Sequence, residues 1–328
     1  MPTHPQTLQG STVVVTGASS GFGRGTALEL GRQGANVVVA ARRTALLDEV
    51  VAEIEAAGGH ALAVTTDVAD AAQVQALSEA ATSRFGRYDV WINNVGIGAL
   101  GYFWDVPLDV HARVVDVNLT GLMNGCHVAL KHFIEHGGGT VVNTGSVDSE
   151  IPIALQNSYA ATKAGVLSLG HALNVELKLA ELDETIKVAT VMPWAADTPW
   201  FEHAANYTGH APRMILMDDP QVVVDVLVEA CTDPKEDMPA GLKAKGAVLS
   251  AKLAGDLTER LSGTIFKREM EKGFPRPINN GAVFEPTPDG DGVEGNVRER
   301  MAREDAAAEG RARPLRSVGQ RPERRGCR

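Results

Sequence analysis

Between residues 12 and about 192, short apolar runs rich in β-branched residues alternate with longer stretches of helical period. The runs lack the polar alternation of a half-exposed strand, so both faces of the expected sheet must be covered. Strands that alternate with helices pair in parallel. The sequence therefore predicts an α/β fold, a Rossmann-type doubly wound parallel sheet with helices on both faces. The expected strands are 12–16, 36–40, 61–65, 88–93, 140–144 and 186–192.

The connecting stretches and the remainder of the chain divide it into three parts. After residue 193 the alternation stops, and 197–219 resembles a mobile loop without clear period. Residues 237–242 are a candidate seventh strand. We expect a dinucleotide-binding and catalytic domain over 10–242, a helical and irregular extension over 243–295, and a basic, disordered tail over 296–328 that begins as a frayed helix at about Val297. The expected helices are 22–34, 44–57, 70–85, 110–136, 157–182, 221–231 and an amphipathic stretch over 242–272.

Charge and cysteine content limit the classes of partner. The chain has 328 residues, a formal net charge of −10 and three cysteines, Cys126, Cys231 and Cys327. The acidic balance argues against a nucleic-acid partner, and the cysteines are too far apart for a disulfide framework or a metal pair. His203 and His210 also lack metal-ligand spacing, so no metal is expected. No apolar run approaches the ~18 residues of a membrane span, and we expect a cytoplasmic protein.

A glycine-rich turn joins the first expected strand to the first helix. Glycines at 17, 21 and 23 permit a tight turn and a close backbone approach, and the helix N-terminus offers free N–H groups to phosphate. An ordinary glycine-rich turn is the alternative, but its place after the first strand favours a dinucleotide pyrophosphate. The candidate cofactor residues here are Gly17, Ser19, Ser20, Gly21, Phe22 and Gly23.

The residues after the second strand indicate which nicotinamide nucleotide binds. NAD sites place a carboxylate there, whereas this chain has Arg42 and Arg43, which suit a 2′-phosphate. A solvated basic pair is the alternative, although cations at a helix N-terminus oppose its dipole. The sequence thus favours NADP(H). Asp67 and Val68, which follow the third strand, would contact the adenine of the nucleotide. The alternative is that Asp67 only marks the start of a helix.

Four further residues suggest proton transfer beside a carbonyl: Asn118, Ser146, Tyr159 and Lys163. Tyr159 and Lys163 are four apart on an expected helix and hence on one face. A phenol is too weak an acid unaided, and a neighbouring ammonium lowers its pKa. Ser146 would hold the substrate oxygen, and Asn118 would anchor a water or a helix kink on the proton path. Each residue alone has a structural alternative.

Together these motifs resemble the short-chain dehydrogenase/reductase family over residues 10 to about 235. The resemblance implies that Tyr159 is the general acid and base, that Lys163 also binds the nicotinamide ribose, and that Ser146 orients the carbonyl. Asn118 would complete the tetrad. Two departures stand out, Val95 in place of the usual alanine and Trp194 in place of glycine. The family pattern implies that six further residues support or contact the cofactor: Asn93, Asn94, Val95, Gly96, Pro193 and Thr198.

The expected function is that of an NADP(H)-dependent oxidoreductase, a ketoreductase that interconverts a carbonyl and a secondary alcohol. A non-catalytic cofactor-binding sensor or scaffold, or an epimerase or dehydratase on the same fold, remains the alternative. The small-molecule substrate is expected to be apolar because aromatic residues crowd the loop after the sixth strand, and the family implies a homodimer or homotetramer through helices 110–136 and 157–182. The residues on which these two expectations rest are Trp194, Trp200, Phe201, Tyr207 and Met214 for the pocket, and Leu122, Met123, Val128, Leu167, Leu169 and Leu173 for the interface.

Overall fold

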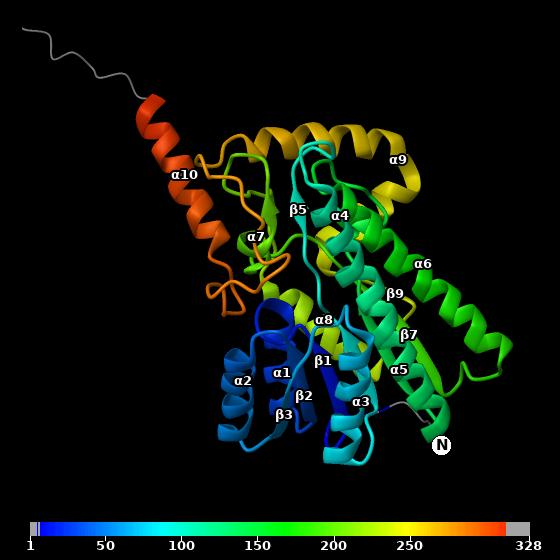
Figure 1. Ribbon diagram of the computed structural model, residues 1–328. Helices are drawn as coiled ribbons and strands as arrows, with labels where there is room; N and C mark the ends of the chain where they lie inside the picture. Colours follow the sequence, from blue (N-terminus) through cyan, green and yellow to red (C-terminus); the bar gives the residue numbers. More distant parts are fainter. Residues whose placement is uncertain (1–4, 6, 313–328) are drawn as a thin grey trace, which may run out of the picture.

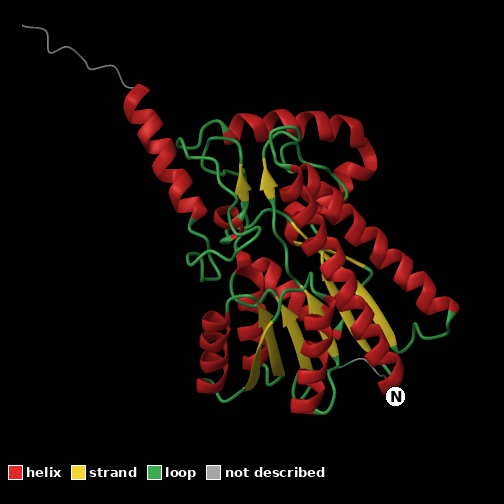
Figure 2. Cartoon of the chain, viewed as in Figure 1, coloured by secondary structure: helices red, strands yellow, loops and turns green. Residues whose placement is uncertain are grey.

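A seven-stranded parallel sheet forms the centre of the protein, in the order β3-β2-β1-β4-β6-β7-β9 (Figures 1 and 2). The computed structural model describes residue 5 and residues 7–312, without the side chains of 252, 254–262 and 310–312. All six expected strands and the seventh are present, which confirms the predicted fold class. Their bounds are β1 Thr12–Thr16, β2 Asn36–Ala41, β3 His60–Thr65, β4 Val90–Asn93, β6 Gly139–Thr144, β7 Ile186–Pro193 and β9 Asp237–Ala240.

Apolar side chains leave both faces of the sheet and create two cores. Val13 and Val15 of β1 pack on one side, and Val14 packs on the other. All three are fully buried, because alternate residues of a strand point to opposite faces. Helices α1 Gly21–Arg32, α2 Thr44–Ala56 and α8 Pro220–Thr232 cover the first face, whereas α3 Ala71–Phe85, α4 Leu108–Val115, α5 Gly121–His136 and α6 Asn157–Leu179 cover the second.

The strand order reverses direction at β1, whose neighbours are β2 and β4. The connections that follow β1 and β4 therefore diverge to opposite faces and leave a crevice at the carboxyl ends of the strands. The remaining elements gather over this edge of the sheet, with α9 lying across the end of the molecule (Figure 1). They are β5 Ala99–Leu100, α7 Trp200–His203, β8 Ala205–Asn206, α9 Gly241–Met270 and α10 Val297–Ala312.

The segment expected to be a mobile loop, 197–219, is packed. It contains α7 and β8, and β8 pairs with β5. Phe201 and Met214 join Phe266 and Met270 of α9 in a third apolar cluster. The sequence showed no period because this segment packs through irregular contacts with a distant part of the chain.

Residues 297–312, at the start of the basic tail, form a helix, α10, which agrees with the expectation of a helix from about Val297. The Asp197 carboxylate accepts hydrogen bonds from the backbone N–H groups of Val297 at 2.7 Å and Arg298 at 3.2 Å, which caps the start of the helix. Arg213, which is 1% exposed, donates to Glu304 of α10 and to Glu269 of α9. These partners lie far away in the sequence. Residues 313–328 lie outside the described residues.

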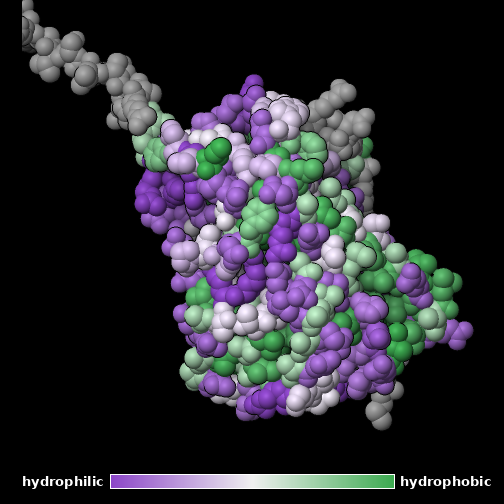
Figure 3. All heavy atoms as spheres, in the orientation of Figure 1, coloured by the Kyte–Doolittle hydropathy of each residue, from purple (hydrophilic) through white to green (hydrophobic). Residues whose placement is uncertain are grey.

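The helices proposed as an interface bury much of the apolar surface on which that expectation rested. Leu122, Val128 and Leu167 are buried within the subunit, whereas Met123 is 48% exposed. Other apolar residues remain at the surface of α5 and α6, where Figure 3 shows apolar side chains gathered. They are Ile134, Val175 and Leu179. Within the described residues, no helix has both the length and the apolar composition that crossing a bilayer requires.

Candidate functional site

The glycine-rich turn between β1 and α1 depends on the absence of side chains. Gly17 and Gly21 have positive φ angles of 71° and 54°, which disfavour other residues. A Cβ atom at Gly23 would lie only 2.2 Å from the Gly17 carbonyl oxygen. Ser20 begins α1 without capping it through its side chain. The Ser20 side chain therefore does not occupy the N–H groups of the first turn, although that of Gly21 donates to the Gly292 carbonyl; an uncapped helix N-terminus of this kind suits phosphate.

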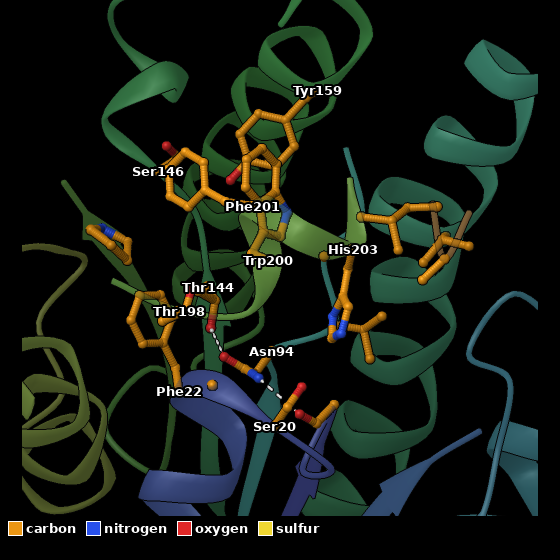
Figure 4. A pocket seen from close by; sticks show the side chains of 18 of the residues that line it. Ser20, Phe22, Asn94, Thr144, Ser146, Tyr159, Thr198, Trp200, Phe201 and His203 are labelled. Carbon is orange, nitrogen blue, oxygen red and sulfur yellow. Dashed lines mark hydrogen bonds between the residues drawn. The ribbon is translucent and has the colours of Figure 1, made fainter. Parts of the chain in front are cut away.

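A cavity of about 240 Å³ lies along the carboxyl ends of the strands. Figure 4 shows Ser20, Phe22 and Asn94 toward the glycine turn, and Ser146 and Tyr159 toward the other end with Trp200 and Phe201. Gly23 and Asn118 do not line the cavity. The predicted site residues that do line it are Gly17, Ser19, Ser20, Gly21, Phe22, Arg42, Arg43, Asp67, Val68, Asn94, Val95, Gly96, Ser146, Tyr159, Lys163, Pro193 and Thr198.

Ser146, Tyr159 and Lys163 meet at one end of this cavity. Tyr159 and Lys163 lie one turn apart on α6, and the Lys163 Nζ atom is 5.6 Å from the centre of the Tyr159 ring. Lys163 is 2% exposed and donates a 2.7 Å hydrogen bond to the Thr144 carbonyl at the end of β6. Ser146 follows β6, and its Oγ accepts a 3.1 Å hydrogen bond from the Asp148 backbone. The Ser146 hydroxyl proton is thereby left to donate elsewhere.

The ionisation of this group differs from the sequence-based expectation. Burial raises the pKa of Tyr159, the charge of Asp148 raises it further, and a hydrogen bond with Ser146 opposes both. We expected Lys163 to lower this pKa, but the effects of burial and of Asp148 are larger. Burial lowers the pKa of Lys163 to about 8, against the opposing charge of Asp148. Lys163 therefore loses its proton at a lower pH than an amine of ordinary pKa does.

Asn118 sits in the middle of a π-helical turn, Asp116–Thr120, that joins α4 to α5. Its side-chain oxygen accepts from the Ile97 backbone N–H, and its amide donates to the Ile97 carbonyl, both at 2.8 Å. The amide also lies 3.2 Å from the Thr162 hydroxyl on α6. Through these contacts Asn118 ties the loop after β4 to the helix that carries Tyr159 and Lys163.

Arg42 and Arg43 face the segment 282–292 of the extension, which lies over the glycine turn. Arg42 donates to the carbonyls of Ala282 at 2.7 Å and Phe284 at 2.8 Å. Arg43 donates to the Ser20 hydroxyl at 2.9 Å and to the Gly290 carbonyl at 3.2 Å. Burial lowers the pKa of both guanidiniums. The extension thus positions both cations at the cavity, and Ser20 of the glycine turn adds a second contact to Arg43.

The same segment reaches the start of α1, where the Gly292 carbonyl accepts a 2.9 Å hydrogen bond from the Gly21 N–H. Thr198, which follows β7, lies against Gly21 from the other side. Asp67 also has a partner, since its carboxylate forms an ion pair with Arg113 of α4. Trp194 lines the cavity, so its indole forms part of the cavity wall where the family has a glycine. Its Nε1–H donates a 3.1 Å hydrogen bond to the Leu216 carbonyl, which holds the ring in place.

Several cavity residues were not found from the sequence. Asp148 had no motif, His203 was expected to be exposed, and Ala282 and Thr287 belong to a segment without period. Only Asp148 carried a usable signal, because a carboxylate two residues after Ser146 is unusual in a buried turn. Tyr207, expected in the pocket wall, does not line the cavity; its hydroxyl instead bonds Asn280.

The chain is similar to known proteins over most of its length. A family model described as short chain dehydrogenase matches residues 11–207. Over 282 residues the chain is 31% identical to YxnA, an uncharacterized oxidoreductase of Bacillus subtilis (strain 168), a match that covers 85% of this chain and 79% of that protein. A match of that length exceeds residues 1–242, so the relative shares part of the extension.

Solved structures share the fold. A short chain dehydrogenase/reductase from Burkholderia phymatum in complex with NAD gives a TM-score of 0.67 at 25% identity and covers 77% of this chain and 96% of its own. A metagenomic short-chain oxidoreductase in complex with NADP gives a TM-score of 0.59 at 26% identity and covers 72% of this chain and 99% of its own. The two neighbours carry different nucleotides.

Proposed function

This chain belongs to the short chain dehydrogenase family, and from that premise we propose that it is an NADP(H)-dependent oxidoreductase that interconverts a carbonyl compound and a secondary alcohol. One observation carries the proposal. The cavity joins a phosphate-binding turn at one end to Ser146, Tyr159 and Lys163 at the other. Such a cavity suits a long cofactor whose reactive end reaches a proton donor.

The residues of the cavity fit a nicotinamide dinucleotide. Gly96 has no side chain where a Cβ atom would contact the Lys163 Nζ at 3.5 Å, and α1 offers its N-terminus to the pyrophosphate. When bound, the nucleotide supplies or accepts the hydride. Asn94, Val95, Gly96, Pro193 and Thr198 would contact its nicotinamide half, and Asp67 and Val68 its adenine.

The preference for NADP(H) rests on Arg42 and Arg43. No carboxylate follows β2 at the place where a ribose 2′-hydroxyl would need one, and both guanidiniums border the cavity. Their present partners are backbone carbonyls and, for Arg43, the hydroxyls of Ser19 and Ser20; all of these are weaker acceptors than a phosphate dianion. A 2′-phosphate would therefore compete well for both side chains.

Tyr159 is assigned to proton transfer and Ser146 to binding of the substrate oxygen. The Ser146 hydroxyl donates its proton to that oxygen, while one of its lone pairs accepts from the Asp148 backbone N–H. The Tyr159 Oη gives its proton to the oxygen during reduction and takes it back during oxidation. Lys163 is fixed by Thr144 and acts on the phenol through its charge, and Asn118 positions α6.

The substrate is proposed to be largely apolar. Trp194, Trp200 and Phe201 line the end of the cavity near Tyr159, and the Trp200 ring lies 5.0 Å from the Tyr159 ring. Met214 adds a flexible wall that adapts to different shapes.

The test is a screen of the purified protein with NADPH and a panel of apolar ketones, read as loss of absorbance of the reduced nicotinamide. We expect turnover that is faster with NADPH than with NADH. Binding of NADPH without turnover of any ketone or alcohol would contradict the enzymatic assignment and favour a sensor. A product formed with no net change in the nicotinamide would instead indicate an epimerase or dehydratase.

We also propose a homodimer or homotetramer in the cytoplasm. The support for assembly is the exposed apolar surface of α5 and α6, at Met123, Ile134, Val175 and Leu179. The support for a reducing location is that Cys126 and Cys231, the cysteines among the described residues, are buried free thiols. Light scattering tests the assembly. It compares the native protein with a Val175→Glu variant, which places a charge on that surface.

A further inference from the structure

Asp148 is a buried carboxylic acid in the cavity to which the proposed reaction assigns no role. It is 3% exposed and lines the cavity at the Tyr159 end. Within the described residues its Oδ2 atom has no hydrogen-bond partner. A buried carboxyl oxygen without a partner costs free energy, and native proteins rarely retain one without a use.

The position of Asp148 is fixed relative to the reacting end of the cavity. It lies in the 3-10 turn Val147–Ser149, directly after Ser146. The Ser149 hydroxyl accepts from the Ser146 N–H at 3.3 Å and donates to the Lys163 carbonyl on α6 at 2.8 Å. The turn is thereby tied to the helix that carries Tyr159. A ligand group that contacts the Asp148 carboxyl must therefore lie close to the substrate oxygen that Ser146 and Tyr159 are proposed to bind.

The charges around Asp148 restrict what that group can be. Burial raises the pKa of Asp148 to about 7, and the positive charge of Lys163 opposes the rise. An anionic ligand would be repelled by the ionised carboxylate. An ammonium would place a second cation beside buried Lys163, which costs Coulomb energy in an enclosed site. A neutral hydroxyl donor avoids both penalties and satisfies the unpartnered oxygen.

We propose that Asp148 is a substrate-binding residue that accepts a hydrogen bond from a hydroxyl group next to the reacting carbon. The substrates would then be α-hydroxy ketones and vicinal diols whose remaining part is apolar, in keeping with Trp200, Phe201 and Met214 in the cavity wall. This assignment deepens the proposed function and rests on it for the identity of the reacting carbon. A site built around such a contact discriminates strongly against an analogue that lacks the hydroxyl.

The experiment compares 1-phenyl-1,2-ethanediol with 1-phenylethanol, which lacks only the second hydroxyl. Their dissociation constants are measured from the quenching of tryptophan fluorescence, with and without NADP⁺, since Trp194 and Trp200 line the cavity. We expect the native protein to bind the diol about ten- to a hundredfold more tightly, as for a hydrogen bond to a charged group. This preference should shrink in Asp148→Asn and vanish in Asp148→Ala.

Glu150→Gln is the matched control, because Glu150 lies two residues further on and does not line the cavity. It should keep the native preference. Equal binding of the two compounds by the native protein, or a preference that persists in Asp148→Ala, would overturn the inference. The near-isosteric Asp148→Asn variant keeps the test decisive if the alanine variant does not fold.

A parallel assay of 2-hydroxyacetophenone and acetophenone with NADPH separates this inference from the proposed function. A diol preference that depends on Asp148, without consumption of NADPH by either ketone, would defeat the proposed function and leave the binding role intact. Reduction of both ketones with equal kcat/KM, together with equal binding of the two alcohols, would defeat the inference and leave the proposed function intact.

Discussion

The two sides of the cavity are held by different kinds of interaction. On the sheet side, backbone groups do most of the positioning, as when Lys163 bonds the Thr144 carbonyl and Asn118 bonds both backbone groups of Ile97. On the extension side, which is formed by 197–219 together with α9 and α10, buried charged side chains join the segments, as Arg213 joins α9 to α10. Backbone contacts survive most substitutions, whereas a buried charge depends on each partner. The chemistry and the anchoring of the extension should therefore be separable by mutation.

The largest effect is expected on the sheet side. Replacing Tyr159 by phenylalanine removes the phenolic proton and keeps the ring, so we expect kcat to fall by about 10²–10⁴ while NADPH affinity changes little. Steady-state kinetics and a fluorescence titration of NADPH measure the two quantities. Tyr207→Phe is the control, because Tyr207 does not line the cavity. A Tyr159→Phe enzyme that kept more than a tenth of the native rate would refute the assigned proton transfer.

The extension side should respond most to the loss of Arg213. Arg213→Ala removes the buried cation that Glu269 and Glu304 share. It leaves them with Lys272 and Arg300 as their cationic partners. We expect it to lower the free energy of unfolding by about 3 kcal/mol. Urea unfolding followed by circular dichroism gives this value. Lys235→Ala, which removes an exposed ion pair with Glu229, should leave stability unchanged. If both variants were equally stable, charge would not be what anchors the extension.

Arg42 lies in the turn between β2 and α2 and donates hydrogen bonds to the extension. We expect Arg42→Ala to weaken NADPH binding by about ten- to a hundredfold, from about 1.5 to 3 kcal/mol for a charge-assisted contact, and NADH binding much less. Dissociation constants for both nucleotides decide the point. Arg32→Ala, at the far end of α1, serves as the control. Equal losses for the two nucleotides, or a native preference for NADH, would remove the basis for NADP(H).

The smallest predicted effect is a pH dependence from Asp148. Its folded pKa of about 7 lies above the unfolded value of 3.8, so ionisation in the folded state costs stability as pH rises toward and through 7. Asp148→Asn removes this cost. We expect the variant to gain at least about 1.4 kcal/mol relative to the native protein between pH 5 and pH 8, one pKa unit's worth. Urea unfolding at both pH values provides the comparison, and a constant difference would show that Asp148 does not titrate in this range.

The sheet side could be predicted from the sequence because its signals are local. The run Thr12–Thr16 followed by glycines 17, 21 and 23 defines a strand, a turn and a helix without reference to the rest of the chain. The spacing of Tyr159 and Lys163 defines one helix face in the same way. The structure brings these residues together because parallel strands end at one edge of the sheet.

The extension side could not be predicted because its contacts join residues that are far apart. Arg213 finds Glu269 and Glu304 over separations of 56 and 91 residues, and Arg42 finds Ala282 over 240. No period in the sequence records such pairs. For the same reason the packing of 197–219 was missed, since Phe201 and Met214 pack against α9 and Asp197 caps α10.

The central claim is that the two ends of the cavity act together in hydride transfer to a carbonyl. The most direct test uses NADPH deuterated at the transferable C4 position with an apolar hydroxy ketone, and mass spectrometry of the alcohol formed. We predict that the alcohol carries one deuterium on the former carbonyl carbon, and that Tyr159→Phe binds the nucleotide but forms almost none of this product. An alcohol without deuterium, or equal labelling by the Tyr159→Phe variant, would contradict the account.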